Sequence, residues 1–106
     1  MSDERRINQR KQILLEARWE SLSSRHEARV DDVSLGGCFV NTYAKIEIGE
    51  HVEVEIQLPS GEWLALRGQV ASYLPGVGFG LSFDLLTVEE TARLKELIRT
   101  AVERRV

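Results

Sequence analysis

Cysteine, histidine and proline are scarce in this sequence. It holds one cysteine, two histidines and two prolines in 106 residues. A lone Cys38 cannot form an internal disulfide, and it excludes a zinc site built from several thiolates. Its neighbours, Gly37 and Phe39, predict that it is a small buried hydrophobic residue.

Long hydrophobic runs are also missing. No apolar stretch approaches the ~20 residues that a membrane-spanning helix requires. The first ten residues, MSDERRINQR, lack the apolar core of a signal peptide. We therefore expect a cytoplasmic protein with no membrane insertion. The formal net charge of -3 gives no general attraction to DNA, RNA or an anionic membrane, so anion binding would need a local basic cluster.

Catalytic motifs are absent as well. The sequence has no nucleophile elbow, no phosphate-binding P-loop and no H-E-x-x-H metal motif. His26 and His51 stand in separate polar segments and read as surface residues. The carboxylates are scattered along the chain, as on a solvated surface. We therefore expect no enzymatic activity, no metal and no cofactor.

The hydrophobic pattern that is present has a period of two over most of the chain. It is clearest at 51–58, where Val52, Val54, Ile56 and Leu58 alternate with polar residues. Gly68 interrupts the longest such segment and predicts a bend or bulge there. About six strands are expected in one domain over 13–106, at 13–20, 27–34, 37–43, 51–59, 63–73 and 79–85.

The last segment changes to the helical period. Thr87 and Glu90 have the spacing of a capping box, and an apolar stripe follows, so we expect a helix over 88–104. Strands without β-α-β alternation, followed by one helix, predict an all-β fold, a small antiparallel barrel with a C-terminal helix.

Two short segments could carry a binding function. Residues 1–12 read as a flexible basic arm in which Arg5, Arg6 and Arg10 could grip a phosphate, although a solvated charged tail has the same composition. The second segment, DDVSLGGCF at 31–39, is either a hydrogen-bonded turn or a ligand-binding loop. Asp32 offers acceptors for a pair of N–H donors such as a guanine edge presents.

Within this second segment, Ser34 can brace the turn or contact a ligand. Gly36 and Gly37 permit a positive φ and let another group approach the backbone.

Together, the two segments resemble the signature of the PilZ domain family. Arg6 and Arg10 match its RxxxR motif, and residues 32–37 match its [D/N]xSxxG motif in the same order. GFGLSF at 78–83 is similar to the family's closing strand, so the resemblance covers nearly the whole chain. It implies a six-stranded antiparallel barrel and a bacterial receptor for cyclic di-GMP, with roles in motility or biofilm formation.

The resemblance also implies roles for individual residues. Arg6 and Arg10 would contact phosphates and the Hoogsteen edges of guanine, while Asp32, Ser34 and Gly37 would accept the other guanine face. In this family, an arginine at the position of Arg5 is associated with binding of an intercalated dimer of the nucleotide.

Tyr73 matches a position that is often aromatic in the family. Simple strand alternation turns it outward, where it could stack on a base, but a bulge would disturb this parity. One departure from the family pattern is that Arg10 is followed by KQI rather than by apolar residues, which indicates a longer arm.

Three functions are compatible with these features of the sequence. The first is a receptor whose arm orders around cyclic di-GMP and presents a changed surface to a protein effector, with a homodimer left open. The second is a PilZ-like adaptor that binds proteins and no nucleotide. The third is a barrel for single-stranded nucleic acid, which would need basic strands interleaved with aromatic residues. The chain has seven aromatic residues and an acidic total, which disfavours this third reading.

Overall fold

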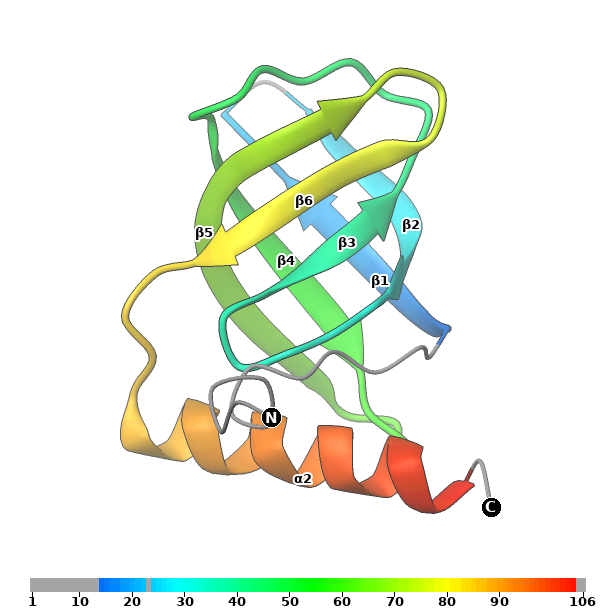
Figure 1. Cartoon of the computed structure of the whole chain (residues 1–106), viewed down its shortest axis with the longest axis vertical. Helices are drawn as coiled ribbons and strands as arrows, with labels where there is room; N and C mark the ends of the chain where they lie inside the picture. The colour runs from blue at the N-terminus through cyan, green and yellow to red at the C-terminus, as the bar shows by residue number, and fades with distance from the viewer. Residues whose placement is uncertain (1–13, 23, 105–106) are drawn as a thin grey trace, which may run out of the picture.

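The computed structural model describes residues 14–22 and 24–104, which form six strands and one helix (Figure 1). All neighbouring strands are antiparallel, and the sheet closes into a barrel in the order β1-β2-β3-β6-β5-β4. The elements are β1 (Leu15–Glu20), β2 (Arg25–Asp31), β3 (Gly37–Asn41), β4 (His51–Gln57), β5 (Trp63–Leu74), β6 (Gly78–Phe83) and α2 (Val88–Arg104). The predicted six-stranded antiparallel barrel with a C-terminal helix is confirmed.

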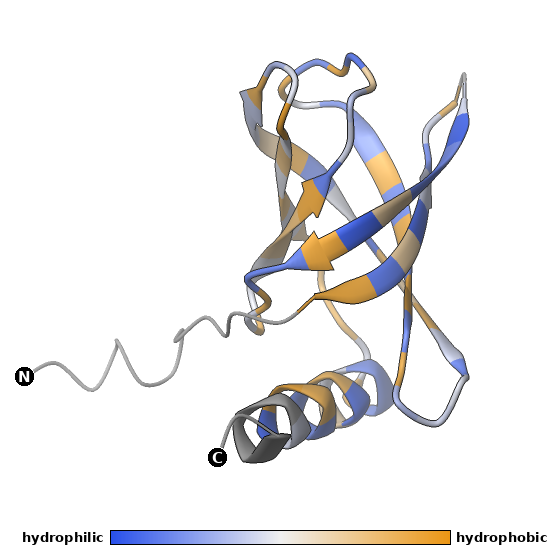
Figure 2. Cartoon of the chain, turned by 90° about the vertical axis from the view of Figure 1, so that its right-hand side faces the viewer, coloured by the Kyte–Doolittle hydropathy of each residue, from blue (hydrophilic) through white to orange (hydrophobic). Residues whose placement is uncertain are grey.

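The alternating apolar residues fill the barrel. In β4, Val52, Val54 and Ile56 are buried while their neighbours are more exposed. Figure 2 shows hydrophobic and hydrophilic residues alternating along the strands. Burial of such side chains stabilises the fold by about 1.5–3 kcal/mol each. Cys38 on β3 is buried among them, as its apolar neighbours predict.

One end of this core is built around Trp19. Its ring is buried, meets the Phe79 ring edge-on at 5.2 Å between centroids, and stacks on His26 at 4.6 Å. His26 is thus half-buried and lies within β2, which begins at Arg25 and not at Glu27 as expected. The turn before it is shorter than the polar sequence suggests, because the Ser21 N–H bonds to the Ser24 carbonyl across only two residues.

The helix α2 lies across the other mouth of the barrel (Figure 1). Leu94 and Leu97 on its apolar stripe are buried in the same core cluster as the strand residues. The capping box at its start is present, since the Glu90 N–H donates to Thr87 Oγ1 and the Thr87 N–H donates to Glu90 Oε1, each at 3.0 Å. The helix therefore closes the mouth that the strands alone would leave open.

The prediction of a bend or bulge at Gly68 is wrong for the bulge. Gly68 stays in register with Val52 and Phe83, and a Cβ at this position would lie 2.2 Å from the Ser82 carbonyl oxygen. The irregularity falls between Val70 and Ser72, where β5 carries one residue more than β6. Gly68 is required for close packing of two backbones, which is the other reason for a glycine inside a strand.

Candidate functional site

The three arginines of the basic arm, Arg5, Arg6 and Arg10, lie outside the described residues. What the structure shows is the place where the arm joins the barrel. Leu15, the first residue of β1, is the register partner of Val30 near the end of β2. Asp32 follows two residues after Val30, so the arm joins the barrel beside the loop that carries the second motif.

This loop is braced from within by Ser34. The Ser34 side chain is buried, and its Oγ accepts the Gly36 N–H at 3.2 Å. The Ser34 N–H donates to the Gly37 carbonyl at 2.9 Å, and Ser34 Oγ donates to the same carbonyl at 3.4 Å. The Ser34 hydroxyl therefore shapes the turn, as a short hydroxyl side chain does in many loops.

The strained backbone position of the loop is Asp32. Its φ is 60°, in the left-handed region that few residues except glycine, asparagine and aspartate adopt. Gly36 and Gly37 permit a positive φ, but neither adopts one. Asp31, the preceding residue, accepts a hydrogen bond from the Asn41 amide at 3.2 Å, which ties the end of β2 to β3.

The two glycines of the loop have different roles. Gly36 is exposed, and a Cβ there would meet only Ser34 Oγ at 3.9 Å. Gly37 is buried, and a Cβ there would lie 2.1 Å from the Leu81 carbonyl oxygen on β6. The group that approaches Gly37 closely is thus the backbone of β6, and Gly36 is the glycine open to a ligand.

The expected outward orientation of Tyr73 is corrected by the structure. Tyr73 is in register with Phe79, which is fully buried, and residues directly opposite on antiparallel strands share a face. The Tyr73 side chain is accordingly half-buried and packs against the core. The extra residue between Val70 and Ser72 reverses the parity of β5, so alternation counted from Leu64 gives the wrong face.

A hollow next to the loop contains residues that the motifs did not indicate. It has a volume of about 770 Å3 and lies over the outer face of β1, β2 and β3, beside the turn between β5 and β6. It is lined by Leu14, Glu16, Glu27, Ala28, Arg29, Asn41, Thr42, Tyr43, Gly76 and Val77. Arg29 could have been found from the sequence, because strand alternation places it on the same face as Asp31. Tyr43 could not, because it lies in an irregular loop.

In residues 14–22 and 24–104, His, Cys, Asp and Glu side chains form no cluster of three or more suited to a metal ion. Over the same part of the chain, no helix has the length and apolar character to span a bilayer.

The fold and the loop together define a small closed antiparallel barrel with a braced loop beside the start of β1. A family model for the PilZ domain matches residues 4–100, and the chain belongs to the PilZ domain family. PilZ domains are cyclic di-GMP receptor domains and not enzymes. A search of the curated proteins finds no match.

Three solved structures are similar to the chain. The PilZ domain of CeSA from a cellulose-synthesizing bacterium has 19% identity and a TM-score of 0.69, over 86% of this chain and 95% of that one. The Bacillus subtilis inhibitor of motility MotI/DgrA has 14% identity and a TM-score of 0.69, over 91% of this chain and 48% of that one.

The third is the Borreliella burgdorferi PlzA protein, solved in complex with c-di-GMP. It has 17% identity and a TM-score of 0.61, over 92% of this chain and 37% of that one. The chain thus spans less than half the length of MotI and of PlzA. At these identities the three structures support the barrel fold.

Proposed function

We propose that this chain is a cytoplasmic receptor that binds cyclic di-GMP between its N-terminal arginine arm and the loop at residues 32–37. The observation that carries the proposal is the pairing of Leu15 with Val30, which attaches the arm beside the loop. Three residues lie between Arg10 and Leu14, so four Cα–Cα steps join them, and an extended chain covers at most ~3.6 Å per step. Arg10 is therefore within about 14 Å of the described barrel edge.

The chemistry of the two motifs suits the two parts of the ligand. Arg6 and Arg10 carry permanently charged planar forks that bind phosphate oxygens bidentately and also match the O6/N7 edge of guanine. Asp32 supplies carboxylate acceptors for guanine N–H donors. The exposed backbone of Gly36 lets the ring approach the loop. Arg5 adds a third cation, which would favour an intercalated dimer with four phosphates.

Binding would act as a switch through the arm. The phosphates stabilise the state in which the arginines surround the ligand, and they stabilise no other arrangement of the arm to the same extent. The closed arm then presents a new surface to a protein effector. A similar structure, PlzA, was solved with c-di-GMP, which supports this choice of ligand.

Isothermal titration with cyclic di-GMP tests the proposal. Arg6→Ala, Arg10→Ala and Asp32→Ala should each weaken binding, about 30- to 1,000-fold for loss of a desolvated arginine–phosphate contact worth about 2–4 kcal/mol. Arg25→Ala is the matched control, because Arg25 is an exposed arginine at the opposite end of β2. The fitted stoichiometry separates one nucleotide per chain from a bound dimer.

The main alternative is a PilZ-like adaptor that recognises proteins alone. Absence of heat and of thermal stabilisation at micromolar cyclic di-GMP would favour that adaptor and contradict the receptor. Binding that is equally strong in the wild type and in all three variants would instead place the nucleotide elsewhere on the barrel.

A further inference from the structure

The hollow beside the loop gathers exposed apolar side chains that the barrel itself does not use. Leu14, Tyr43 and Val77 line it and are 60%, 89% and 52% exposed, respectively. A volume of about 770 Å3 is within the range of pockets that hold small organic ligands, about 300–1,000 Å3. This side of the barrel, on the right in Figure 1, faces the viewer in Figure 2.

The wall that carries Tyr43 is held in place by the fold. The Thr42 N–H donates to the Val77 carbonyl at 3.1 Å, which joins the segment after β3 to the turn between β5 and β6. The Ala44 N–H donates to Thr42 Oγ1 at 3.2 Å, which bends the chain at Tyr43. Tyr43 is thus an exposed residue on a braced segment that lines the hollow.

The polar groups of the hollow are matched to a nucleobase. Arg29 provides guanidinium donors for a guanine O6/N7 edge, and its Nε lies 3.4 Å from a Glu16 carboxylate oxygen. The Asn41 side-chain carbonyl, and the carboxylate of Glu27, offer acceptors for the N–H groups of the opposite guanine edge. Two carboxylates against one guanidinium give the hollow a negative balance, which disfavours a phosphate and tolerates a neutral base.

A hydrogen bond connects the hollow to the strand end that precedes the motif loop. Asn41 lines the hollow and donates to Asp31, the residue immediately before Asp32. Leu14 lines the opposite side and is the first described residue after the arginine arm. Arg29 lies on β2 three residues before Asp32, a span of about 10 Å at the ~3.3 Å rise of a strand. A cyclic dinucleotide has two guanines, one for each place.

We propose that the hollow is a guanine subsite in which Tyr43 stacks on the second base of the nucleotide and Arg29 binds the O6/N7 edge of that base. The inference rests on the proposed receptor function, and it assigns binding roles to two residues outside both sequence motifs. The phosphates then lie toward the arginine arm, away from Glu16 and Glu27.

Titration of the full chain with cyclic di-GMP tests the subsite. Tyr43→Ala should weaken binding about 5- to 100-fold, and Tyr43→Phe should bind like the wild type because it keeps the ring. Arg29→Gln should weaken binding by a similar factor. Arg25→Gln is its control, an equally exposed arginine on the same strand that is not among the lining residues.

The salt dependence of binding distinguishes a contact with a base from a contact with a phosphate. Between about 0.1 and 0.5 M NaCl, the ratio of the Tyr43→Ala and wild-type dissociation constants should stay constant, because stacking carries no net charge. The corresponding ratio for Arg6→Ala should fall as the phosphate contact is screened.

The possible failures are distinguishable. If the wild type binds and Arg6→Ala is weakened, but Tyr43→Ala and Arg29→Gln bind normally, the subsite is wrong and the receptor function stands. If Tyr43→Phe is as weak as Tyr43→Ala, or if Arg25→Gln is as weak as Arg29→Gln, the stacking and base-edge roles are overturned. If the wild type does not bind, the receptor function fails and the subsite fails with it.

Discussion

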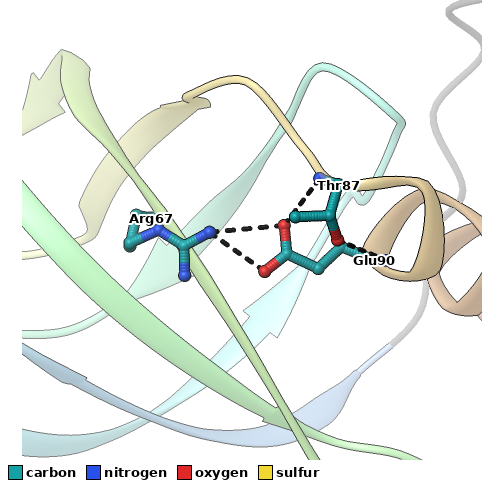
Figure 3. A network of polar contacts seen from close by, with 3 residues as sticks. All are labelled: Arg67, Thr87 and Glu90. Carbon is teal, nitrogen blue, oxygen red and sulfur yellow. Dashed lines mark hydrogen bonds and ion pairs between the residues drawn. The ribbon is translucent and has the colours of Figure 1, made fainter.

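Arg67 on β5 holds the first turn of α2 through Glu90. Its Nη2 lies 2.9 Å and 3.3 Å from the two carboxylate oxygens of Glu90 (Figure 3). The same carboxylate accepts the Thr87 N–H of the capping box. One side chain therefore both caps the helix and ties it to the barrel wall, and the Glu90 side chain is only 18% exposed.

Removal of Glu90 should loosen the helix more than removal of its neighbour. Glu90→Ala loses the cap and the Arg67 contact, and we expect the free energy of unfolding to fall by about 1–2 kcal/mol. Glu89→Ala is the control, since Glu89 has the same charge in the same turn and is exposed. Urea unfolding followed by circular dichroism measures both variants, and equal losses would show that only the helix dipole is involved.

The Glu90 contribution should depend on pH. The Thr87 backbone N–H, and then Arg67, stabilise the carboxylate and lower the pKa of Glu90 from its usual value of 4.5. A lowered folded-state pKa gives a contribution that is complete above the unfolded pKa and is lost as the pH falls through the folded value. The gap in unfolding free energy between wild type and Glu90→Gln should therefore be complete above the usual pKa of 4.5 and narrow as the pH falls below it. A gap that stays constant as the pH falls below 4.5, down to acid unfolding, would contradict this role.

The sequence predicted the strands and the helix better than it predicted the contacts between them. Strict alternation at Val52, Val54 and Ile56 indicated a strand with one buried face, and the spacing of Thr87 and Glu90 indicated the start of a helix. Both signals are local, and both are confirmed. The Arg67–Glu90 pair spans 23 residues and depends on how α2 crosses the barrel mouth, so no local pattern indicated it.

Packing of α2 into the barrel mouth should depend on Leu94. Leu94 is fully buried, so Leu94→Ala should cost about 2–5 kcal/mol through lost apolar contact and a residual cavity. Lys95→Ala is the adjacent control on the exposed side of the helix. Thermal unfolding gives both values, and a loss below about 0.5 kcal/mol for Leu94→Ala would mean that the helix contributes little to the core.

The site was less predictable because it depends on register and backbone conformation. One extra residue in β5 turns Tyr73 toward the core, and alternation alone could not locate that residue at Ala71. Gly36 and Gly37 permit a positive φ, but in this loop it is Asp32 that adopts one. Asp, like Asn, tolerates this region because its short side chain bonds locally, which the composition of the loop does not reveal.

The two loop glycines should respond differently to a methyl group. Gly37→Ala places a Cβ 2.1 Å from the Leu81 carbonyl oxygen, so β3 and β6 must separate and the protein should lose about 2–4 kcal/mol. Gly36→Ala meets no atom closer than 3.9 Å and should change stability by less than about 1 kcal/mol. Gly36→Ala is therefore the variant with which to measure cyclic di-GMP binding, and we expect weaker binding with a normal melting temperature. Equal stability of the two variants would contradict the close approach of β6.

Asp32 should serve both the backbone and the ligand, and three substitutions separate these roles. Asp32→Gly accepts a φ of 60° without strain, so the free energy of unfolding should change by about 1 kcal/mol or less. It removes the carboxylate acceptors, so binding should weaken about 5- to 100-fold. Asp32→Asn should keep the fold and bind with an affinity between those of the wild type and Asp32→Gly, because Asn tolerates this conformation and retains one of the two acceptors.

Asp32→Ala should lose both properties, with about 1–2 kcal/mol of backbone strain added to the weaker binding. Titration calorimetry and urea unfolding of the same three proteins give the two readouts in parallel. If Asp32→Gly bound cyclic di-GMP as tightly as the wild type, Asp32 would act through the backbone alone. The guanine edge would then have to find its acceptors elsewhere on the barrel. If the Asp32 side chain contacts the ligand, Asp32→Asn should bind cyclic di-GMP more tightly than Asp32→Gly, although both residues tolerate the turn conformation.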